Sequence, residues 1–224
     1  MSFDPATVRI SYDRMADRYA EEFDDELSHR PLERALLGAL PELAGLDTRP
    51  GVVADLGAGP AHVARHLRAA GVPTIAIDLA PAMAVVANHR NHVPAAAGSL
   101  TALPLAGASL GAAVVFYAVI HLDDEGLQAA ASELARVLRP GGVALISIHV
   151  GDEVRHLDEW HGEPVDLDFR FLRPDALGRL LAGTGLRVEA TLEREPIADV
   201  EAQTRRAYVL ARRPIVASGP SMEG

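Results

Sequence analysis

The stretch Asp55-Leu56-Gly57-Ala58-Gly59-Pro60 is the part of this chain whose residue types and spacing most clearly predict chemistry. An apolar run, 52–54, leads into it, and a helix-like segment, 61–70, follows it. Gly57 and Gly59 let the backbone turn sharply and approach a ligand, while the first N–H groups of the helix suit an anionic or carboxylate-bearing partner. A strand, a glycine turn and a helix in this order predict a ligand site.

A second apolar run, 72–77, ends in an acidic residue, Asp78. In nucleoside sites of α/β proteins, an acid at the end of the second strand accepts hydrogen bonds from the ribose hydroxyls. The glycine turn and Asp78 therefore predict a nucleoside pocket at the carboxyl edge of a sheet.

Two candidates for proton transfer follow the predicted fourth strand, 111–117. His121 would face the cleft as a general base, or it would cap the helix that starts near Asp123 and Asp124. Tyr117 has a similar position, where it would form an aromatic wall of the pocket or take part in proton transfer. Both are predicted catalytic residues.

These residues need a scaffold, and the hydrophobic pattern predicts one. Two helical segments, 6–26 and 31–43, form an N-terminal cap, and strands and helices then alternate from 51 to 150. Such alternation with continuous apolar strands predicts a doubly wound α/β fold with helices on both faces of a mostly parallel sheet. The strands are expected near 51–56, 73–78, 93–97, 111–117 and 142–149, and the helices near 60–70, 81–90 and 124–138.

The last third of the chain adds a helix, 174–183, and two strands, 186–193 and 206–212. Before them, the segment 149–171 is rich in His, Asp, Glu and aromatic residues, and connections this long are more often functional than structural. We expect one domain, 1–213, divided into the cap (1–46), a cofactor-binding half (51–150) and a substrate-side half (151–213). The tail, 214–224, is predicted to be disordered.

Composition narrows the function classes. The chain has 224 residues, of which 49% are hydrophobic. It lacks an apolar run long enough to cross a bilayer, so we expect a cytoplasmic protein without a membrane partner. It contains neither cysteine nor lysine, which excludes thiol catalysis, Cys-ligated zinc and lysine Schiff bases. The net charge of −10 disfavours nucleic acid and favours a small neutral or cationic partner. The expected state is a monomer or homodimer.

The pattern resembles the class I S-adenosylmethionine-dependent methyltransferases. Their signature is an acid-Leu-Gly-x-Gly loop followed by an acidic residue at the end of the second strand. The resemblance spans roughly residues 6–213 and is supported by four further segments: Asp78-Leu79-Ala80-Pro81-Ala82-Met83, Gly98-Ser99-Leu100-Thr101-Ala102-Leu103-Pro104-Leu105, Phe116-Tyr117-Ala118-Val119-Ile120-His121, and Leu134-Ala135-Arg136-Val137-Leu138-Arg139-Pro140-Gly141-Gly142. It implies a seven-stranded sheet whose last strand runs antiparallel to the others.

The resemblance also implies S-adenosylmethionine as the cofactor and methyl transfer to a small-molecule acceptor. Gly57, Ala58 and Gly59 would approach the methionine moiety, with Asp55 near its amino group. Asp78 would accept both ribose hydroxyls. Ser99 stands where the family usually has an acid for the adenine amino group, so a hydroxyl or a backbone carbonyl takes that role. The remaining cofactor-binding positions are Tyr19, Leu79, Met83, Leu100 and Phe116, of which Leu79 and Met83 would pack on the adenine.

Two other functions remain open from the sequence. A nicotinamide-dependent oxidoreductase also uses a glycine turn, but the third glycine of its G-x-G-x-x-G pattern falls at His62, which is too large for close helix–strand packing. A regulatory protein that binds the cofactor without transferring its methyl group would keep the same pocket. Methyl donation itself requires mainly that the acceptor be held in line with the methyl carbon.

Residues outside the nucleoside pocket give weaker signals. Tyr12 and Tyr19 lie two turns apart on the first helix, where they would close over the ligands or pack in the core. The acceptor pocket would draw on His149, His156 and Trp160, which otherwise are exposed loop residues.

No metal site is predicted, because His62 and His66 lack the glutamate of a zinc signature and are interpreted as a surface pair. The charged residues near the last strands are interpreted as a solvated face: Glu193, Glu195, Glu201, Arg205, Arg206, Arg212 and Arg213.

Overall fold

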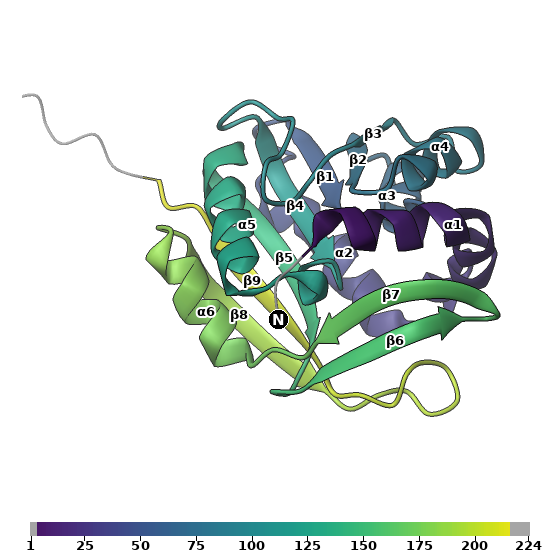
Figure 1. Cartoon of the computed structure of the whole chain (residues 1–224). Helices are drawn as coiled ribbons and strands as arrows, with labels where there is room; N and C mark the ends of the chain where they lie inside the picture. The colour runs from purple at the N-terminus through teal and green to yellow at the C-terminus, as the bar shows by residue number, and fades with distance from the viewer. Residues whose placement is uncertain (1–3, 216–224) are drawn as a thin grey trace, which may run out of the picture.

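The computed structural model describes residues 4–215 and is built around a seven-stranded sheet (Figure 1). Its strand order is β3-β2-β1-β4-β5-β9-β8. Neighbours from β3 to β5 pair in parallel, whereas β9 runs antiparallel to both β5 and β8. The strands are β1 (Val52–Leu56), β2 (Thr74–Asp78), β3 (Ala95–Ala97), β4 (Leu110–Phe116), β5 (Leu138–His149), β8 (Arg187–Arg194) and β9 (Arg206–Arg212).

Helices cover both faces of this sheet. Leu134 of α5 and Leu181 of α6 pack in one apolar cluster with the strands, and Leu40 of α2 and Leu67 of α3 pack in another. The predicted doubly wound, mostly parallel α/β fold is confirmed. The helices are α1 (Pro5–Phe23), α2 (Pro31–Leu43), α3 (His62–Ala69), α4 (Pro81–His89), α5 (Asp124–Val137) and α6 (Pro174–Gly183), with short 3-10 turns η1 (Glu26–His29) and η2 (Val119–His121).

The order of the strands positions the site. The chain moves outward from β1 to β3 and then returns to place β4 on the other side of β1. A crevice forms at such a reversal, outside the carboxyl ends of the strands. The carboxyl ends of β1, β2 and β4 carry Asp55, Asp78 and Tyr117, so the topology gathers the predicted site residues at one edge.

The sequence pattern predicts a long connection over 149–171 and places no strand in it, whereas the structure has two strands there. The segment contains an antiparallel hairpin, β6 (Val154–Trp160) and β7 (Glu163–Arg170), which forms a separate two-stranded sheet beside α1 (Figure 1). The backbone has positive φ at His161 and Gly162 in the turn, as tight hairpin turns require. Val165 and Leu167 are buried against Met15 of α1, so one apolar face of the hairpin packs on the N-terminal helix.

Together, α1 and the hairpin cover the carboxyl edge of the sheet. Asp4 caps α1 by accepting a hydrogen bond from the backbone N–H of Ala6 (2.9 Å), and Pro5 begins the helix. The Ser11 hydroxyl accepts a hydrogen bond from the Asp166 N–H (3.0 Å), which ties α1 to β7. Within residues 4–215 no helix has the length and apolarity that a membrane crossing needs. Most of the predicted disordered tail, 216–224, lies outside the described residues.

Candidate functional site

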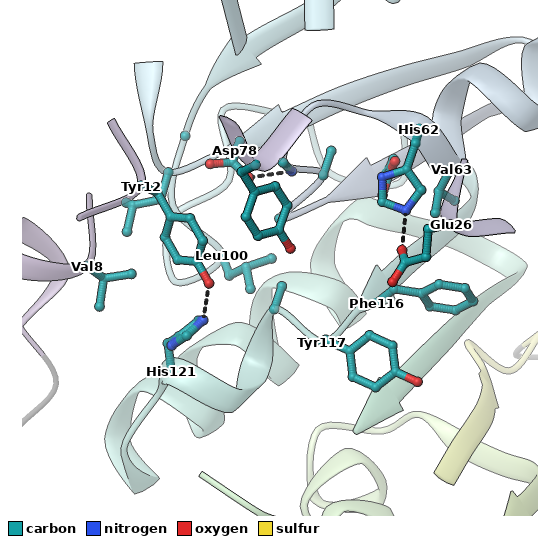
Figure 2. A pocket seen from close by; sticks show the side chains of 18 of the residues that line it. Val8, Tyr12, Glu26, His62, Val63, Asp78, Leu100, Phe116, Tyr117 and His121 are labelled. Carbon is teal, nitrogen blue, oxygen red and sulfur yellow. Dashed lines mark hydrogen bonds and ion pairs between the residues drawn. The ribbon is translucent and has the colours of Figure 1, made fainter. Parts of the chain in front are cut away.

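A cavity opens at the carboxyl edge of the sheet, between α1 and the ends of β1, β2 and β4 (Figure 2). One end is lined by Asp78, Leu79, Ser99 and Leu100. The glycine turn forms the middle of the wall, and the other end carries a set of charged side chains. We call these the nucleoside end (Asp78, Leu79, Ser99, Leu100) and the polar end (Glu26, Arg30, Glu33, His62).

Glycine is required in the turn after β1. Gly57 has φ +68° and Gly59 has φ +53°, in the left-handed region that side chains disfavour. A Cβ on Gly57 would lie 2.2 Å from the Cβ of Ala118, a distance that real atoms do not tolerate. The loop after β4 therefore packs directly on the backbone of the turn, and the turn lies open to the cavity on its other side.

Asp78 connects the second strand to the glycine turn. Its Oδ2 accepts a hydrogen bond from the Gly59 N–H (2.7 Å), and its Oδ1 accepts one from the Ala80 N–H (2.9 Å). Burial raises the pKa of this carboxyl group to about 6, and the two backbone hydrogen bonds oppose the rise. Each oxygen keeps a lone pair for a ligand hydroxyl, because a carboxylate oxygen accepts two hydrogen bonds.

Asp55 ends β1 as a buried carboxyl group, 2% exposed. Its Oδ2 accepts a hydrogen bond from the Ala64 N–H in the first turn of α3 (3.0 Å). Burial raises its pKa to about 7, although the nearby His62 and the hydrogen bond favour the ionised form. Two carboxyl groups with raised pKa values thus face one cavity, an arrangement that favours a ligand with hydrogen-bond donors or positive charge.

His121 bridges three elements at the nucleoside end. Its Nδ1 lies 2.8 Å from the Asp168 carbonyl oxygen of β7, so this nitrogen carries the proton. Its Nε2 then accepts a hydrogen bond from the Tyr12 hydroxyl (2.9 Å) of α1, as Figure 2 shows. Burial lowers the pKa of His121 to about 4, so the imidazole is neutral at physiological pH.

Tyr117 follows β4 in a strained backbone conformation. Its φ is positive, which is rare for a bulky residue and concentrates at functional sites. The ring lines the cavity and stacks on His149, with 4.9 Å between the ring centroids. Its hydroxyl lies 3.4 Å from the hydroxyl of Tyr208, and burial raises its pKa.

The polar end of the cavity was not found by the sequence analysis. Nε2 of His62 lies 2.8 Å from Oε2 of Glu26 (Figure 2), and Nη2 of Arg30 lies 2.7 Å from Oε1 of the same glutamate. The interpretation of His62 as a surface residue is wrong, because its side chain is 12% exposed and lines the cavity. The Glu26–Arg30 spacing of four residues is the one local signal that was available.

The predicted solvated face near the last strands is also partly wrong. The side chain of Glu201 is fully buried and that of Arg206 is 3% exposed, and they form an ion pair of 3.1 Å between Oε2 and Nε. They belong to a buried network that reaches the polar end, because Glu201, in the loop after β8, also lies 3.6 Å from Nε of Arg30. Exposed members of the predicted face, such as Arg205, pair with Glu193 on the surface.

Known proteins are similar to this chain in sequence and in fold. Residues 53–142 match a family described as "Methyltransferase domain". A malonyl-[acyl-carrier protein] O-methyltransferase from Enterobacter lignolyticus (strain SCF1) is 32% identical over 195 residues, covering 85% of this chain and 72% of that protein. A protein of the same name from Pseudescherichia vulneris is 32% identical over 168 residues, covering 74% of this chain and 64% of that protein.

The fold is shared with Burkholderia thailandensis 1,6-didemethyltoxoflavin-N1-methyltransferase, solved with S-adenosylhomocysteine. The TM-score is 0.68 at 21% identity, and the match covers 94% of this chain and 88% of that one. The chain belongs to the class I S-adenosylmethionine-dependent methyltransferases. The cofactor of this methyltransferase is S-adenosylmethionine, and the nicotinamide alternative is set aside.

The cavity fits this cofactor in two respects. Each oxygen of the Asp78 carboxylate accepts one backbone N–H and keeps a lone pair for a ribose hydroxyl, and the backbone of the glycine turn lines the cavity. Seven predicted cofactor positions besides these also line the cavity: Tyr19, Asp55, Ala58, Leu79, Ser99, Leu100 and Phe116. Met83 does not; it is fully buried beside Ala16 and Ala20. Its contact with the adenine stays a prediction.

The predicted acceptor residues are more scattered. Tyr12 lines the cavity, whereas His149 lies behind Tyr117, with its Nδ1 2.8 Å from the Thr204 hydroxyl. His156 is half-exposed on the hairpin, where its Nδ1 lies 2.9 Å from Oδ1 of Asp168. Trp160 donates a hydrogen bond to Glu22 (3.1 Å) and contacts the ring of Tyr19. The hairpin therefore supports α1 and is not the cavity wall that a loop was expected to be.

Proposed function

We propose that this methyltransferase transfers the methyl group of S-adenosylmethionine to an oxygen atom of a small-molecule acceptor. The observation that carries the cofactor site is the junction of Asp78 with the glycine turn, at the reversal of strand order. The choice of oxygen is supported by the relatives named above, whose printed names are O-methyltransferases.

In this proposal each end of the cavity has its own task. Asp78 accepts the ribose hydroxyls, and Leu79, Ser99 and Leu100 surround the adenine. Backbone N–H groups of the glycine turn and of the first turn of α3 favour the methionine carboxylate. Asp55 attracts the methionine amino group. Tyr19 on α1 closes this half of the cavity.

The acceptor would lie on the side of Phe116 and Tyr117. When bound, the cofactor supplies an electrophilic methyl carbon on a sulfonium sulfur. The protein contributes by orienting the acceptor oxygen along the S–C axis and by excluding water, and alignment of this kind accounts for large rate effects. The strained backbone of Tyr117 fits a positioning task, because the surrounding packing must hold a conformation that the residue disfavours.

For His121, the contacts support a positioning role more than the predicted role of general base. The Nε2 lone pair that a base would use accepts the Tyr12 hydroxyl, and a pKa of about 4 makes the imidazole a weak base at neutral pH. We propose that His121 holds α1 against η2 and β7. Helix α1 then stays in place as the lid over the nucleoside end. The catalytic roles of His121 and Tyr117 stay predictions.

The cofactor site is tested with Asp78→Asn. The amide keeps the size of the side chain but removes the charge and one acceptor, so we expect the dissociation constant of S-adenosylmethionine to rise by about 10- to 100-fold, or roughly 1–3 kcal/mol. Isothermal titration calorimetry measures it. Asp13→Asn is the matched control, because Asp13 also accepts a backbone N–H, that of Ala82 (2.9 Å), but does not line the cavity. Equal affinities in Asp78→Asn and wild type would refute the proposed site.

The acceptor atom is tested by incubating the protein with methyl-labelled cofactor and a panel of small alcohols, acids and amines. A malonyl thioester of acyl carrier protein is added to the panel, since the relatives are named for that acceptor. Mass spectrometry should locate the label on oxygen. A label found on nitrogen or carbon would contradict the proposal for the acceptor atom and leave the cofactor site standing.

A further inference from the structure

Three residues of the polar end, Glu26, Arg30 and Glu33, belong to a larger buried network of alternating charges. Arg30, Arg194 and Arg206 interleave with three glutamates that come from η1, α2 and the loop after β8: Glu26, Glu33 and Glu201. The network joins segments from the first and last parts of the chain, and its positive and negative groups are equal in number. A buried ionic network of this kind is costly unless every member has a partner.

Most of the charged groups of the network pair with one another. The guanidinium of Arg194 donates to both Glu33 and Glu201. Within residues 4–215, Nε of Arg30 and Nε of Arg206 lack a well-aligned hydrogen bond, but they lie 3.6 Å and 3.1 Å from Oε2 of Glu201. Other donors leave the network: Nη1 of Arg206 donates to the carbonyl oxygens of Ala202 and Thr204, and Nε of Arg194 donates to the Tyr208 hydroxyl.

One acceptor is different. Oε1 of Glu33 accepts from both the Tyr208 hydroxyl and Arg194, whereas Oε2 of Glu33 is buried and has no partner among the described residues. Glu33 is 1% exposed and lines the cavity. Nδ1 of His62 also lacks a partner in the described part of the chain, but His62 begins α3 directly after the glycine turn, on the side of the methionine moiety. In the proposed function the cofactor takes the side of His62, which leaves Oε2 of Glu33 as an unpartnered acceptor among the described residues on the polar side of the cavity.

The charge of the wall indicates which group would satisfy this oxygen. In the part of the chain that the structure describes, four carboxyl groups line the cavity and one guanidinium faces them: Glu26, Glu33, Asp55, Asp78 and Arg30. A free carboxylate placed beside Oε2 of Glu33 would add repulsion, while an N–H donor would relieve a buried acceptor that is costly to leave unpaired. An ammonium group provides such a donor and a favourable charge.

We propose that Glu33 is a specificity-determining residue and that the acceptor carries an amino group, which donates a hydrogen bond to Oε2 of Glu33. Phe116 and Tyr117 line the same part of the cavity and provide aromatic walls for the rest of the molecule. This inference rests on the proposed function, because it assigns to the polar end the anchoring of the molecule that is methylated. The amino group is the anchor, and the methylated oxygen is a separate atom of the acceptor.

Glu33→Gln reverses the polarity of this one contact. The amide oxygen of glutamine can still accept from Tyr208 and Arg194, which places an NH2 donor where Oε2 was. Glu201→Gln is the matched control. Glu201 is equally buried and pairs with the same Arg194, but it does not line the cavity. Both variants remove one negative charge from the network, so thermal denaturation should show similar losses of stability.

The probes are 2-phenylethylamine, 2-phenylethanol and phenylacetate, which share a skeleton and differ in the terminal group. Their binding to protein saturated with S-adenosylhomocysteine is measured by calorimetry. Wild type and Glu201→Gln should bind the amine at least tenfold more tightly than the acid, and Glu33→Gln should lose this preference. The proposal is overturned if wild type binds the alcohol or acid as well as the amine, or binds none of the probes. The comparison of the three probes needs only the wild-type protein, so it tests the proposal even if Glu33→Gln does not fold.

The affinity for S-adenosylmethionine separates this inference from the proposed function. If Oε2 of Glu33 receives the acceptor, Glu33→Gln should leave the dissociation constant of the cofactor within twofold of wild type. A rise of tenfold or more would assign the oxygen to the amino group of the cofactor and overturn the inference, with the methyl transfer proposal intact. Failure of wild type to bind the cofactor would instead remove the proposed function itself.

Discussion

The two ends of the cavity are built in different ways. At the nucleoside end, the carboxylate that faces the ligand is held by backbone groups: Asp78 accepts N–H groups from Gly59 and Ala80. At the polar end, side chains hold one another, as when Glu33 receives both Tyr208 and Arg194 from strands late in the chain. The geometry of the nucleoside end depends on the backbone conformation, and that of the polar end depends on the identity of its side chains.

This difference separates what is general in the site from what is particular to this protein. In the proposed site, a turn and one carboxylate would hold any ligand with the same nucleoside, because the binding atoms are fixed by the fold. In the inference drawn above, a network of side chains with an unpartnered oxygen among the described residues would select among acceptors, because a single substitution changes its polarity. Changes at the nucleoside end should therefore affect all substrates, and changes at the polar end should affect some and not others.

The largest effect is expected from Gly57→Ala, which breaks the nucleoside end at its backbone. The added Cβ would lie 2.2 Å from that of Ala118 and would hold a positive φ, so the turn must move and the dissociation constant of S-adenosylmethionine should rise more than 100-fold. Gly71→Ala is the control, since Gly71 has φ +82° and no described atom within 4 Å of its Cβ position. It should lower stability by about 1 kcal/mol from strain and leave affinity unchanged.

Calorimetry and chemical denaturation of the two variants separate loss of the site from loss of the fold. If Gly57→Ala bound the cofactor as tightly as Gly71→Ala, the backbone of the turn would not be part of the site. The nucleoside end would then need another explanation, and the contrast between the two ends would fail.

The pH dependence of cofactor binding tests the roles of Asp78 and Asp55. The pKa is raised to about 6 for Asp78 and about 7 for Asp55, and a cationic ligand with hydroxyl donors prefers both carboxylates ionised. Affinity for S-adenosylmethionine should therefore rise between pH 5 and pH 8, by about tenfold if only Asp78 must be ionised and by up to about a thousandfold if both carboxylates must be ionised. Calorimetry across this range measures it, and Asp78→Asn should flatten the part of the profile centred near pH 6. An affinity independent of pH would contradict the assignment of these carboxyl groups.

The stability of the free protein should change in the opposite direction. Both carboxyl groups bind protons more tightly in the folded state than in the unfolded chain, where the pKa is 3.8. Their contribution to the free energy of unfolding therefore falls as pH rises from about 4 to about 7. Affinity and stability that moved in the same direction through these two groups would show that the bound ligand does not require their ionised forms.

The same contrast explains what the sequence could predict. Motifs within 55–59 and at 78 predict the residues that the structure brings together at the nucleoside end, because backbone geometry and the residues it needs are local in sequence. Glu33, Tyr208 and Arg194 come together only through the pairing of β8 with β9 and the packing of α2 beneath them, which no local pattern encodes. The hairpin after β5 was missed although β7 carries a local signal, because Val165, Leu167 and Phe169 alternate with polar residues as in a strand with one buried face. What the sequence does not encode is that this apolar face packs on α1 and not on the main sheet.

The smallest effect is expected from Tyr12→Phe, which loosens the lid without touching the turn. The change removes the hydroxyl that donates to Nε2 of His121. This loss costs about 1 kcal/mol and should lower the melting temperature by about 2–4 °C. Because α1 is then held less firmly over the nucleoside end, the dissociation constant of S-adenosylmethionine should rise by about fivefold. Tyr208→Phe, which removes a donor from the polar end, should leave that constant within twofold. If both variants weakened cofactor binding equally, the nucleoside end and the polar end would act as one unit. The division of cofactor binding and acceptor selection between the two ends would then be wrong.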